Sequence, residues 1–259
     1  MISKYAYVDP KAELGNNVEV MPFAFIGEGA VVGDDCVIMP YAGVLKGTVL
    51  GKGNKVHGHA LLGVDPQDFK FSGEESQLII GDNNDIRENV VIARGTHADG
   101  ATRIGNGNFI MEKVHICHDA EIRNNTVLGI ASIIAGCTKI ESEAILSNLV
   151  VVHEGSRIGR FSLIQSGCRV QKDVPPYIIT CGNPVMYHGV NAELLAKKHN
   201  VSERILRHIT NAYRLVFNGD TSVEDAVLKI KEQIPQSEEI ANIMKFIGES
   251  KRGIIQAEY

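Results

Sequence analysis

The stretch from Ile104 to Ile140 reads IGNGNFIMEKVHICHDAEIRNNTVLGIASIIAGCTKI, and an aliphatic residue occupies every sixth position in it. These positions hold Ile104, Ile110, Ile116, Ile122, Leu128, Ile134 and Ile140. A period of six fits neither an amphipathic helix, whose period is 3.6, nor a simple alternating strand. Because internal repeats decide a whole fold, this periodicity takes precedence over any local helix or strand prediction.

The same spacing extends over most of the chain. Aliphatic residues recur in steps of six from Val8 to Leu62, again from Ile80 to Ile92, and without a break from Ile104 to Val170. Four residues after most of them lies a small residue, as at Ala24, Cys36 and Ala60. Gly, Asn and Asp, which tolerate left-handed backbone angles, are frequent between them and suit tight corners.

This pattern predicts a triangular parallel β-helix. Each six-residue unit forms one flat side and one corner, so three units, or eighteen residues, complete one coil. The aliphatic residue and the small residue after it point into the prism. Successive coils stack as parallel strands about 4.8 Å apart, and each coil contacts only its neighbours.

Two segments depart from the repeat, one near residues 63–77 and one near residues 94–103. An insertion in such a solenoid has to loop outward at a corner, and loops of this kind often carry function. The alternative is a tolerated surface insertion without a role.

The chain changes character after Val170. The sequence Asp173-Val-Pro-Pro-Tyr is expected to end the stack because proline donates no ladder hydrogen bond. Helices are predicted from about Asn191, over 201–217 with Ser202 as N-cap, from Thr221 or Ser222 to about Lys231 after a stop at 218–220, and over 237–250. The expected domains are therefore a β-helix over residues 1–190 and a helical domain over residues 191–259.

Composition excludes several classes of protein. The net charge of −5 gives no basic face for nucleic acid, and Trp is absent. The five Cys are widely spaced without a Cys-x-x-Cys pair, which favours reduced thiols and a cytoplasmic location over a disulfide framework. The N-terminus lacks the apolar core of a signal peptide, and no apolar run is long enough for a transmembrane segment.

The candidate chemistry lies at His118, Asp119 and Gly136. His118 follows the inward Ile116 and is expected at a corner, facing out, with Asp119 beside it. Gly136 comes eighteen residues later, so it is expected to stack on His118 in the next coil. A histidine base, a carboxylate that orients it and an exposed backbone N–H for an oxyanion are the parts that acyl transfer needs. The alternative is an ordinary solvated His-Asp pair.

Two other readings of the histidines remain open. His115 and His118, with His57, His59, His97 or His153, offer enough imidazoles for a zinc site of the kind found in γ-class carbonic anhydrases. Against that reading, no third His lies one coil from either, because positions 133 and 136 hold Ile and Gly. No metal or cofactor is therefore expected. A non-catalytic scaffold is the remaining alternative.

The chain resembles the hexapeptide-repeat acyltransferases, and within them the UDP-N-acetylglucosamine acyltransferases, over essentially its full length. The matching segments are Gln67-Asp-Phe-Lys-Phe-Ser-Gly-Glu, Ile86-Arg-Glu, Arg94-Gly-Thr, His115-Ile-Cys-His-Asp, Asp173-Val-Pro-Pro-Tyr, Gly182-Asn-Pro and Gly189-Val-Asn. The resemblance implies a left-handed coil, a homotrimer, and transfer of an R-3-hydroxyacyl chain from acyl carrier protein to the glucosamine 3-position of UDP-N-acetylglucosamine. That reaction is the first step of lipid A biosynthesis.

The resemblance also implies roles for individual residues. His118 matches the general base, Asp119 its partner and Gly136 the oxyanion donor. The residues that match substrate contacts are Gln67, Asp68, Lys70, His115, His153, Asn191 and Glu193. Ser166 falls where the family sets acyl-chain length.

Three positions depart from the family pattern. Cys137 and Ala93 stand where His is frequent, and Glu154 stands where Gln is usual. Cys and Ala cannot reproduce the hydrogen bonds of a His side chain. These departures leave open whether the acceptor is a 3-hydroxyl or a 3-amine, and a relative that acylates another acceptor remains the nearest enzymatic alternative.

Overall fold

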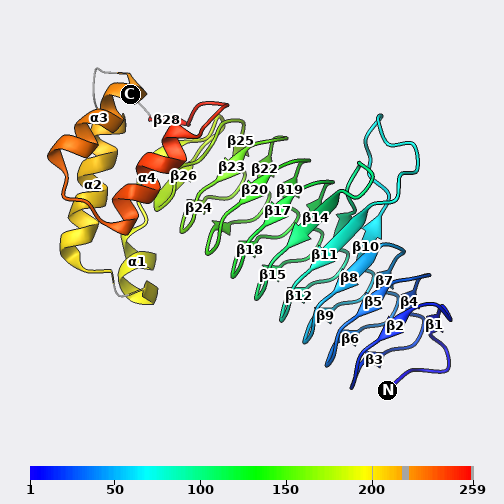
Figure 1. Cartoon of the computed structure of the whole chain (residues 1–259). Coiled ribbons are helices and arrows are strands. Elements are labelled where there is room, and N and C mark those ends of the chain that lie inside the picture. Colours follow the sequence, from blue (N-terminus) through cyan, green and yellow to red (C-terminus); the bar gives the residue numbers. More distant parts are fainter. Residues whose placement is uncertain (200, 218–221, 258–259) are drawn as a thin grey trace.

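The structure is a computed structural model that describes residues 1–199, 201–217 and 222–257. Residues up to Val190 form a left-handed parallel β-helix with three faces, and helices follow it, which confirms the predicted fold class (Figure 1). Three parallel sheets, one for each face, run along the prism because residues eighteen apart pair in register.

The strands of each face are short. Sheet B contains β1 (Tyr7–Val8), β4 (Phe25–Ile26), β7 (Gly43–Val44), β10 (Leu61–Val64), β13 (Val91–Ala93), β16 (His115–Ile116), β19 (Ile133–Ile134), β22 (Val151–Val152) and β25 (Arg169–Val170). Sheet C contains β2 (Glu13–Leu14), β5 (Val31–Val32), β8 (Thr48–Leu50), β11 (Gln77–Ile80), β14 (Ala101–Ile104), β17 (Glu121–Ile122), β20 (Lys139–Ile140) and β23 (Arg157–Ile158).

Sheet A extends furthest toward the C-terminus. Its strands are β3 (Glu19–Val20), β6 (Val37–Ile38), β9 (Lys55–Val56), β12 (Asp85–Ile86), β15 (Phe109–Ile110), β18 (Val127–Leu128), β21 (Ile145–Leu146), β24 (Leu163–Ile164), β26 (Ile178–Cys181), β27 (Met186–Val190) and β28 (Gln256–Ala257).

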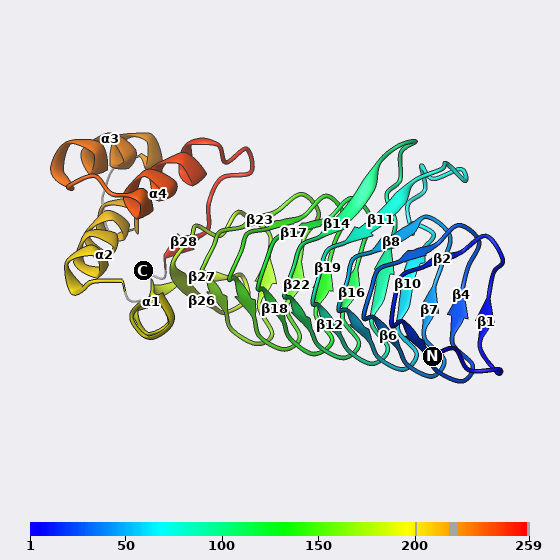
Figure 2. The ribbon, with the colours of Figure 1, turned by 60° about the horizontal axis from the view of Figure 1, so that its bottom comes forward.

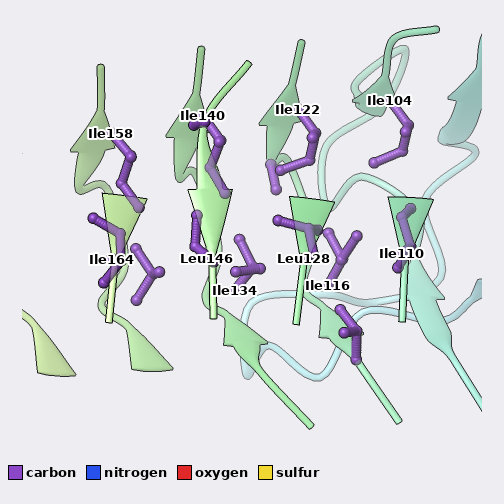
Figure 3. Close-up of a cluster of buried hydrophobic side chains, with 14 of the residues drawn as sticks. Ile104, Ile110, Ile116, Ile122, Leu128, Ile134, Ile140, Leu146, Ile158 and Ile164 are labelled. Carbon is purple, nitrogen blue, oxygen red and sulfur yellow. The ribbon is translucent and has the colours of Figure 1, made fainter. Parts of the chain in front are cut away.

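The aliphatic residue of each repeat fills the prism. Ile116 pairs with Ile134 one coil later, and both side chains are fully buried. Figure 3 shows the same stacking for the repeats between Ile104 and Ile164, whose side chains converge from the three sheets. The small residues also face inward, since Ala30, Cys36 and Ala60 are buried. Each coil thus contributes a thin layer to one continuous apolar core.

A row of polar side chains is also buried in the prism. The Asn84 amide nitrogen and N–H both donate to Oδ1 of Asn54, and Asn108 donates to Oδ1 of Asn84 in the same way, all at 2.9 Å. Thr126 continues the row by donating its N–H and hydroxyl to Asn108. These bonds link successive coils and satisfy groups that would otherwise be buried without partners.

Both insertions leave the prism at the same corner, between sheets B and C. The first loop connects β10 to β11 and the second connects β13 to β14, so they occupy residues 65–76 and 94–100. They project side by side from the prism (Figure 2). His118 and Asp119 lie at this corner in the next coil, between β16 and β17.

The prolines do not end the stack, contrary to the prediction. Val174 bridges Ile158 in parallel, and β26 then pairs in parallel with β24, so hydrogen bonding resumes directly after Pro175 and Pro176. The prolines lie at the connection between these two pairings, where no ladder N–H is needed. β27 then pairs antiparallel with β26.

Among the described residues, four helices follow: α1 (Ala192–His199), α2 (Glu203–Phe217), α3 (Val223–Gln233) and α4 (Glu238–Gly248). Ser222 and Ser237 cap α3 and α4, and the Ser202 hydroxyl accepts from the Ile205 N–H before α2. The expected stop at 218–220 and Thr221 lie outside the described residues. In the described part of the chain, no helix combines the length and apolar character that a membrane crossing requires.

The sequence predicts a helical domain over residues 191–259, but the segment after α4 is not helical. After α4 the chain returns to the prism, where β28 pairs with β27 and Ile254 bridges Asp173. Asp173 also accepts a hydrogen bond from the Ser250 hydroxyl. A two-residue strand lacks the length for a periodic signal, so sequence pattern does not reveal it.

Candidate active site

His118 lies at the corner after β16, with its side chain 11% exposed. Its Nδ1 is 3.0 Å from Oδ2 of Asp119, the next residue in the chain. Asp119 has a φ of +56°, a left-handed angle that turns its carboxylate back toward the ring. When Nδ1 carries the proton and donates it to this carboxylate, Nε2 keeps its lone pair.

Asp119 is held from the second insertion and from β14. The Thr96 hydroxyl donates to Oδ2 of Asp119 at 2.6 Å, and the Thr102 hydroxyl accepts from the Asp119 N–H at 2.8 Å. Burial raises the pKa of the Asp119 carboxyl, but the hydrogen bonds from Thr96 and His118 outweigh burial and place this pKa below its usual value. The carboxylate therefore stays charged and fixes the imidazole.

Gly136 lies against the face of the His118 ring, as the eighteen-residue spacing predicts. A Cβ at this position would be 2.4 Å from Cε1 and 2.7 Å from Nε2 of His118, so a side chain has no room. The adjacent Cys137 N–H donates to the His118 carbonyl at 3.0 Å, which locks the two corners together. Among the described residues, the Gly136 N–H donates no hydrogen bond and is available to a ligand.

The first insertion brings a second carboxylate to the ring. Oδ2 of Asp68 lies 3.5 Å from Nε2 of His118, on the side opposite Asp119. The Lys70 N–H donates to Oδ1 of Asp68 at 2.8 Å, so a local turn orients the carboxylate. The Gln67 and Lys70 side chains are exposed.

Arg94 anchors this insertion. Its guanidinium pairs with Asp65 at 2.9 Å, donates to the Glu74 carbonyl at 2.7 Å and lies over the Phe71 ring. The loop that carries Asp68 is thus fixed by the residue at which the second insertion begins. Both insertions therefore act on the same histidine, one through Asp68 and one through Thr96.

Two further histidines lie near this corner. His115 points outward from sheet B, two residues before Cys117, and burial lowers the pKa of its imidazole. His153 follows β22 and stands two coils beyond Cys117 in register. Glu154 comes next, and its charge is among those that raise the pKa of the Cys137 thiol, after burial and Asp119.

Sequence reasoning assigned no role to Thr96 and Thr102. Thr96 belongs to the Arg94-Gly-Thr segment, which carried part of the family resemblance. Its contact with Asp119 spans twenty-three residues and depends on the path of an irregular loop. No repeat spacing predicts such a contact.

Comparison with known proteins identifies the family of this chain. Residues 173–255 match the family profile of UDP N-acetylglucosamine O-acyltransferase domain 2, and residues 29–63 match the bacterial transferase hexapeptide profile of six repeats. An acyl-[acyl-carrier-protein]–UDP-N-acetylglucosamine O-acyltransferase from Janthinobacterium sp. (strain Marseille) is 42% identical over 99% of this chain and 99% of its own. The chain belongs to the UDP-N-acetylglucosamine O-acyltransferase family.

Solved structures of this family have the same architecture. The acyltransferase from Bacteroides fragilis superposes with a TM-score of 0.97 at 45% identity, covering 98% of this chain and 100% of that one. The acyltransferase from Francisella novicida gives a TM-score of 0.95 at 33% identity, covering 99% and 94%. The insertions and the helical region are thus common features of the family, because coverage is nearly complete in both directions.

Three residues with expected acyltransferase roles lie away from His118 in this chain. Asn191 is buried before α1, where its side-chain amide donates to the Phe161 carbonyl at 2.9 Å. Glu193 lies on α1 and pairs with Lys197, and Ser166 is exposed at the corner after β24. Figure 1 shows α1 and β24 at the helical end of the prism.

The zinc centre built from three histidines does not form among the described residues. The one group of potential ligands found there consists of His118, Asp119 and Cys137. His57 instead lies between Asp85 and Glu88, at 2.9 and 3.3 Å. The histidine set that a γ-class carbonic anhydrase would need is therefore not assembled within the described part of the chain.

Proposed function

We propose that the chain transfers an R-3-hydroxyacyl group from acyl carrier protein to the glucosamine 3-hydroxyl of UDP-N-acetylglucosamine, the first step of lipid A biosynthesis. The observation that carries this proposal is the position of the His118 ring, with Asp119 on Nδ1 and the Gly136 backbone against its face. Its Nε2 faces a carboxylate from an insertion that is shared with acyltransferases of known structure.

In the proposed reaction, His118 Nε2 accepts the proton of the acceptor hydroxyl as its oxygen attacks the thioester carbonyl. The oxyanion that forms accepts a hydrogen bond from the Gly136 N–H, a kind of contact whose removal costs about 3 kcal/mol in other acyl transferases. The C–S bond then breaks, and the imidazolium returns the proton to the leaving thiolate. No covalent enzyme intermediate and no cofactor are needed.

The neighbouring residues have supporting roles. Asp119 keeps the proton on Nδ1 and stabilises the imidazolium as it forms. The Nε2–Asp68 separation of 3.5 Å is longer than a direct hydrogen bond, so an acceptor hydroxyl that enters between them contacts both groups. Gln67, Lys70, His115 and His153 complete the contacts to sugar and acyl chain.

A groove leads from the proposed centre to the C-terminal loop and suits the donor. Cys137 and Gly155 line it at the His118 end, and Ser250, Lys251 and Arg252 line it at the other. Lys139 and Arg157 also line the groove, together with Asp173 and Glu249, so its four basic side chains outnumber its two acidic ones. The phosphate-bearing arm of an acyl carrier protein is anionic and matches this groove in charge.

A homotrimer would allow the residues that lie away from His118 to contact substrate. Asn191, Glu193 and Ser166 lie far from His118 in one chain, so they reach substrate only if a site lies between two prisms. Support comes from sheet B, whose outward residues Tyr7, Phe25 and Leu61 are exposed and apolar. Such a patch marks a protein contact surface.

Five reduced thiols support a cytoplasmic location.

The direct test is a turnover assay with UDP-N-acetylglucosamine and a series of 3-hydroxyacyl carrier proteins of increasing chain length. Mass spectrometry of the product should show one ester at the 3-position and one preferred length. A matched acceptor with a 3-amine measures acceptor choice in the same experiment. Absence of turnover with every donor would support a non-catalytic scaffold, and transfer to the amine alone would support the alternative acceptor.

A further inference from the structure

Three kinds of metal-binding side chain converge beside His118. His118, Asp119 and Cys137 each offer one ligand atom, and these atoms all lie within 4.8 Å of one another. Oδ2 of Asp68 lies at the other ring nitrogen, 3.5 Å from His118 Nε2, and does not belong to this group. Within the described residues, no other three His, Cys, Asp or Glu side chains meet this closely.

The fold itself holds the cluster together. Asp119 and Cys137 occupy the same corner position in successive coils, each with a φ of +56°. The hydrogen bond from the Cys137 N–H to the His118 carbonyl fixes their separation. The arrangement is therefore present before any substrate binds.

The ligand types select the kind of cation. An imidazole, a thiolate and a carboxylate together suit Zn²⁺, whereas Mg²⁺ and Ca²⁺ prefer oxygen ligands alone. Bonds of about 2.0–2.3 Å in a tetrahedron place the ligand atoms roughly 3.5 Å apart. The widest separation here is within 4.8 Å, so closure requires a shift of about 1.3 Å at most, which the exposed Cys137 side chain can supply by rotation.

We propose that His118, Asp119 and Cys137 form an inhibitory Zn²⁺ site at the mouth of the groove. Binding forms a Zn–S bond to Cys137, and the thiol proton passes to solvent without any change of oxidation state. The cation takes the place of the proton between Nδ1 and Asp119, and the ring proton moves to Nε2, so His118 no longer accepts a proton from the acceptor hydroxyl. The inhibition rests on the proposed function, whereas the binding does not.

Binding is tested by calorimetric titration of ZnCl₂ into the metal-free full-length protein, without substrates. One Zn²⁺ per chain is expected, with affinity at least about tenfold weaker in Cys137→Ala, which corresponds to about 1.4 kcal/mol. Cys181→Ala is the matched control, because it removes a thiol at the far end of the prism, and it should bind as wild type does. Equal affinity of wild type and Cys137→Ala, or no binding, overturns the site.

Activity is a separate measurement that distinguishes the two proposals. Zn²⁺ at saturating concentration should suppress acyl transfer by the wild type, and a chelator should restore it. Stoichiometric binding through Cys137 without loss of turnover overturns the inhibition. Zinc bound through Cys137 by a protein that shows no transfer in any condition overturns the proposed function and retains the site.

Discussion

Groups from three different parts of the chain position the His118 imidazole. Asp119 holds Nδ1, Gly136 lies against the ring, and Thr96 holds Asp119 in turn. Nε2 faces the Asp68 carboxylate, 3.5 Å away. These contacts fix the orientation of the imidazole. Misplacing a catalytic base by about 1 Å costs on the order of 100-fold in rate.

Replacing Gly136 by Ala tests this packing. The new Cβ would be 2.4 Å from Cε1 of His118, so the ring has to move, and we expect turnover to fall about 100-fold. Gly58→Ala is the control, because a Cβ there meets only the Pro40 carbonyl, at 3.2 Å. Circular dichroism should show both variants folded. Near-normal turnover of Gly136→Ala would contradict the packing argument.

At the scale of elements, the corner between sheets B and C gathers the site. Both insertions and the His118 corner occupy consecutive coils there, so irregular loops complete a site that regular repeats begin. The repeats fix the spacing of residues along the prism. The loops carry the Asp68 and Thr96 side chains, which contact His118 and Asp119.

Arg94→Ala tests the contribution of the first insertion. The substitution removes the pair with Asp65, the bond to the Glu74 carbonyl and the contact with Phe71, so the loop that carries Asp68 loosens. We expect KM for UDP-N-acetylglucosamine to rise about tenfold or more, with a smaller change in kcat. Lys46→Ala is the matched control, since exposed Lys46 contacts the same loop through Glu75. An unchanged KM in Arg94→Ala would show that the loop needs no anchor.

The buried asparagine row gives a separate prediction about stability. Asn84→Ala removes the acceptor of two Asn108 hydrogen bonds and the donor to Asn54, inside a closed prism. Because unpaired buried polar groups cost about 1–3 kcal/mol each, we expect the free energy of unfolding to fall by roughly 3 kcal/mol. Denaturant titration measures this. Asn16→Ala, which loses an exposed contact with Asp34, should change it by less than about 0.5 kcal/mol.

The repeat predicts some contacts of the candidate site but not others. The inward positions of Ile116 and Ile134, and the stacking of Gly136 on His118, follow from one number, the eighteen residues of a coil. Thr96 and Asp68 could not be placed that way, because loop paths depend on contacts such as those of Arg94. The pairing after Pro176 was missed because a proline was read as a break in the sheet, although a connection tolerates it.

At the scale of the whole molecule, the solenoid has exposed aromatic rings at its N-terminal end. Tyr5, Phe23, Tyr41 and His59 stack along one edge with centroid spacings of 5.9, 5.2 and 5.0 Å. We call these four residues the aromatic column. Its first three rings are each more than half exposed in the single chain. Apolar surface of this extent favours association.

A charge in the aromatic column should therefore disrupt the proposed trimer. We expect light scattering to give three chains for the wild type and a single chain for Tyr41→Asp, because the charge would be buried against a neighbour. Leu228→Asp is the control, because Leu228 is similarly exposed but lies on α3, outside the column. A monomeric wild type, or an intact trimer in Tyr41→Asp, would contradict the assignment.

The most direct test of the proposed mechanism is the rate at which His118→Ala transfers the acyl chain to UDP-N-acetylglucosamine from the preferred 3-hydroxyacyl carrier protein. His188→Ala, which removes an exposed histidine from β27, is the matched control. We predict a loss of about 10²–10⁴-fold in turnover for His118→Ala, with unchanged circular dichroism and mass, and normal turnover for the control. A His118→Ala protein that is folded and turns over at the wild-type rate would contradict the assignment of His118 as the general base.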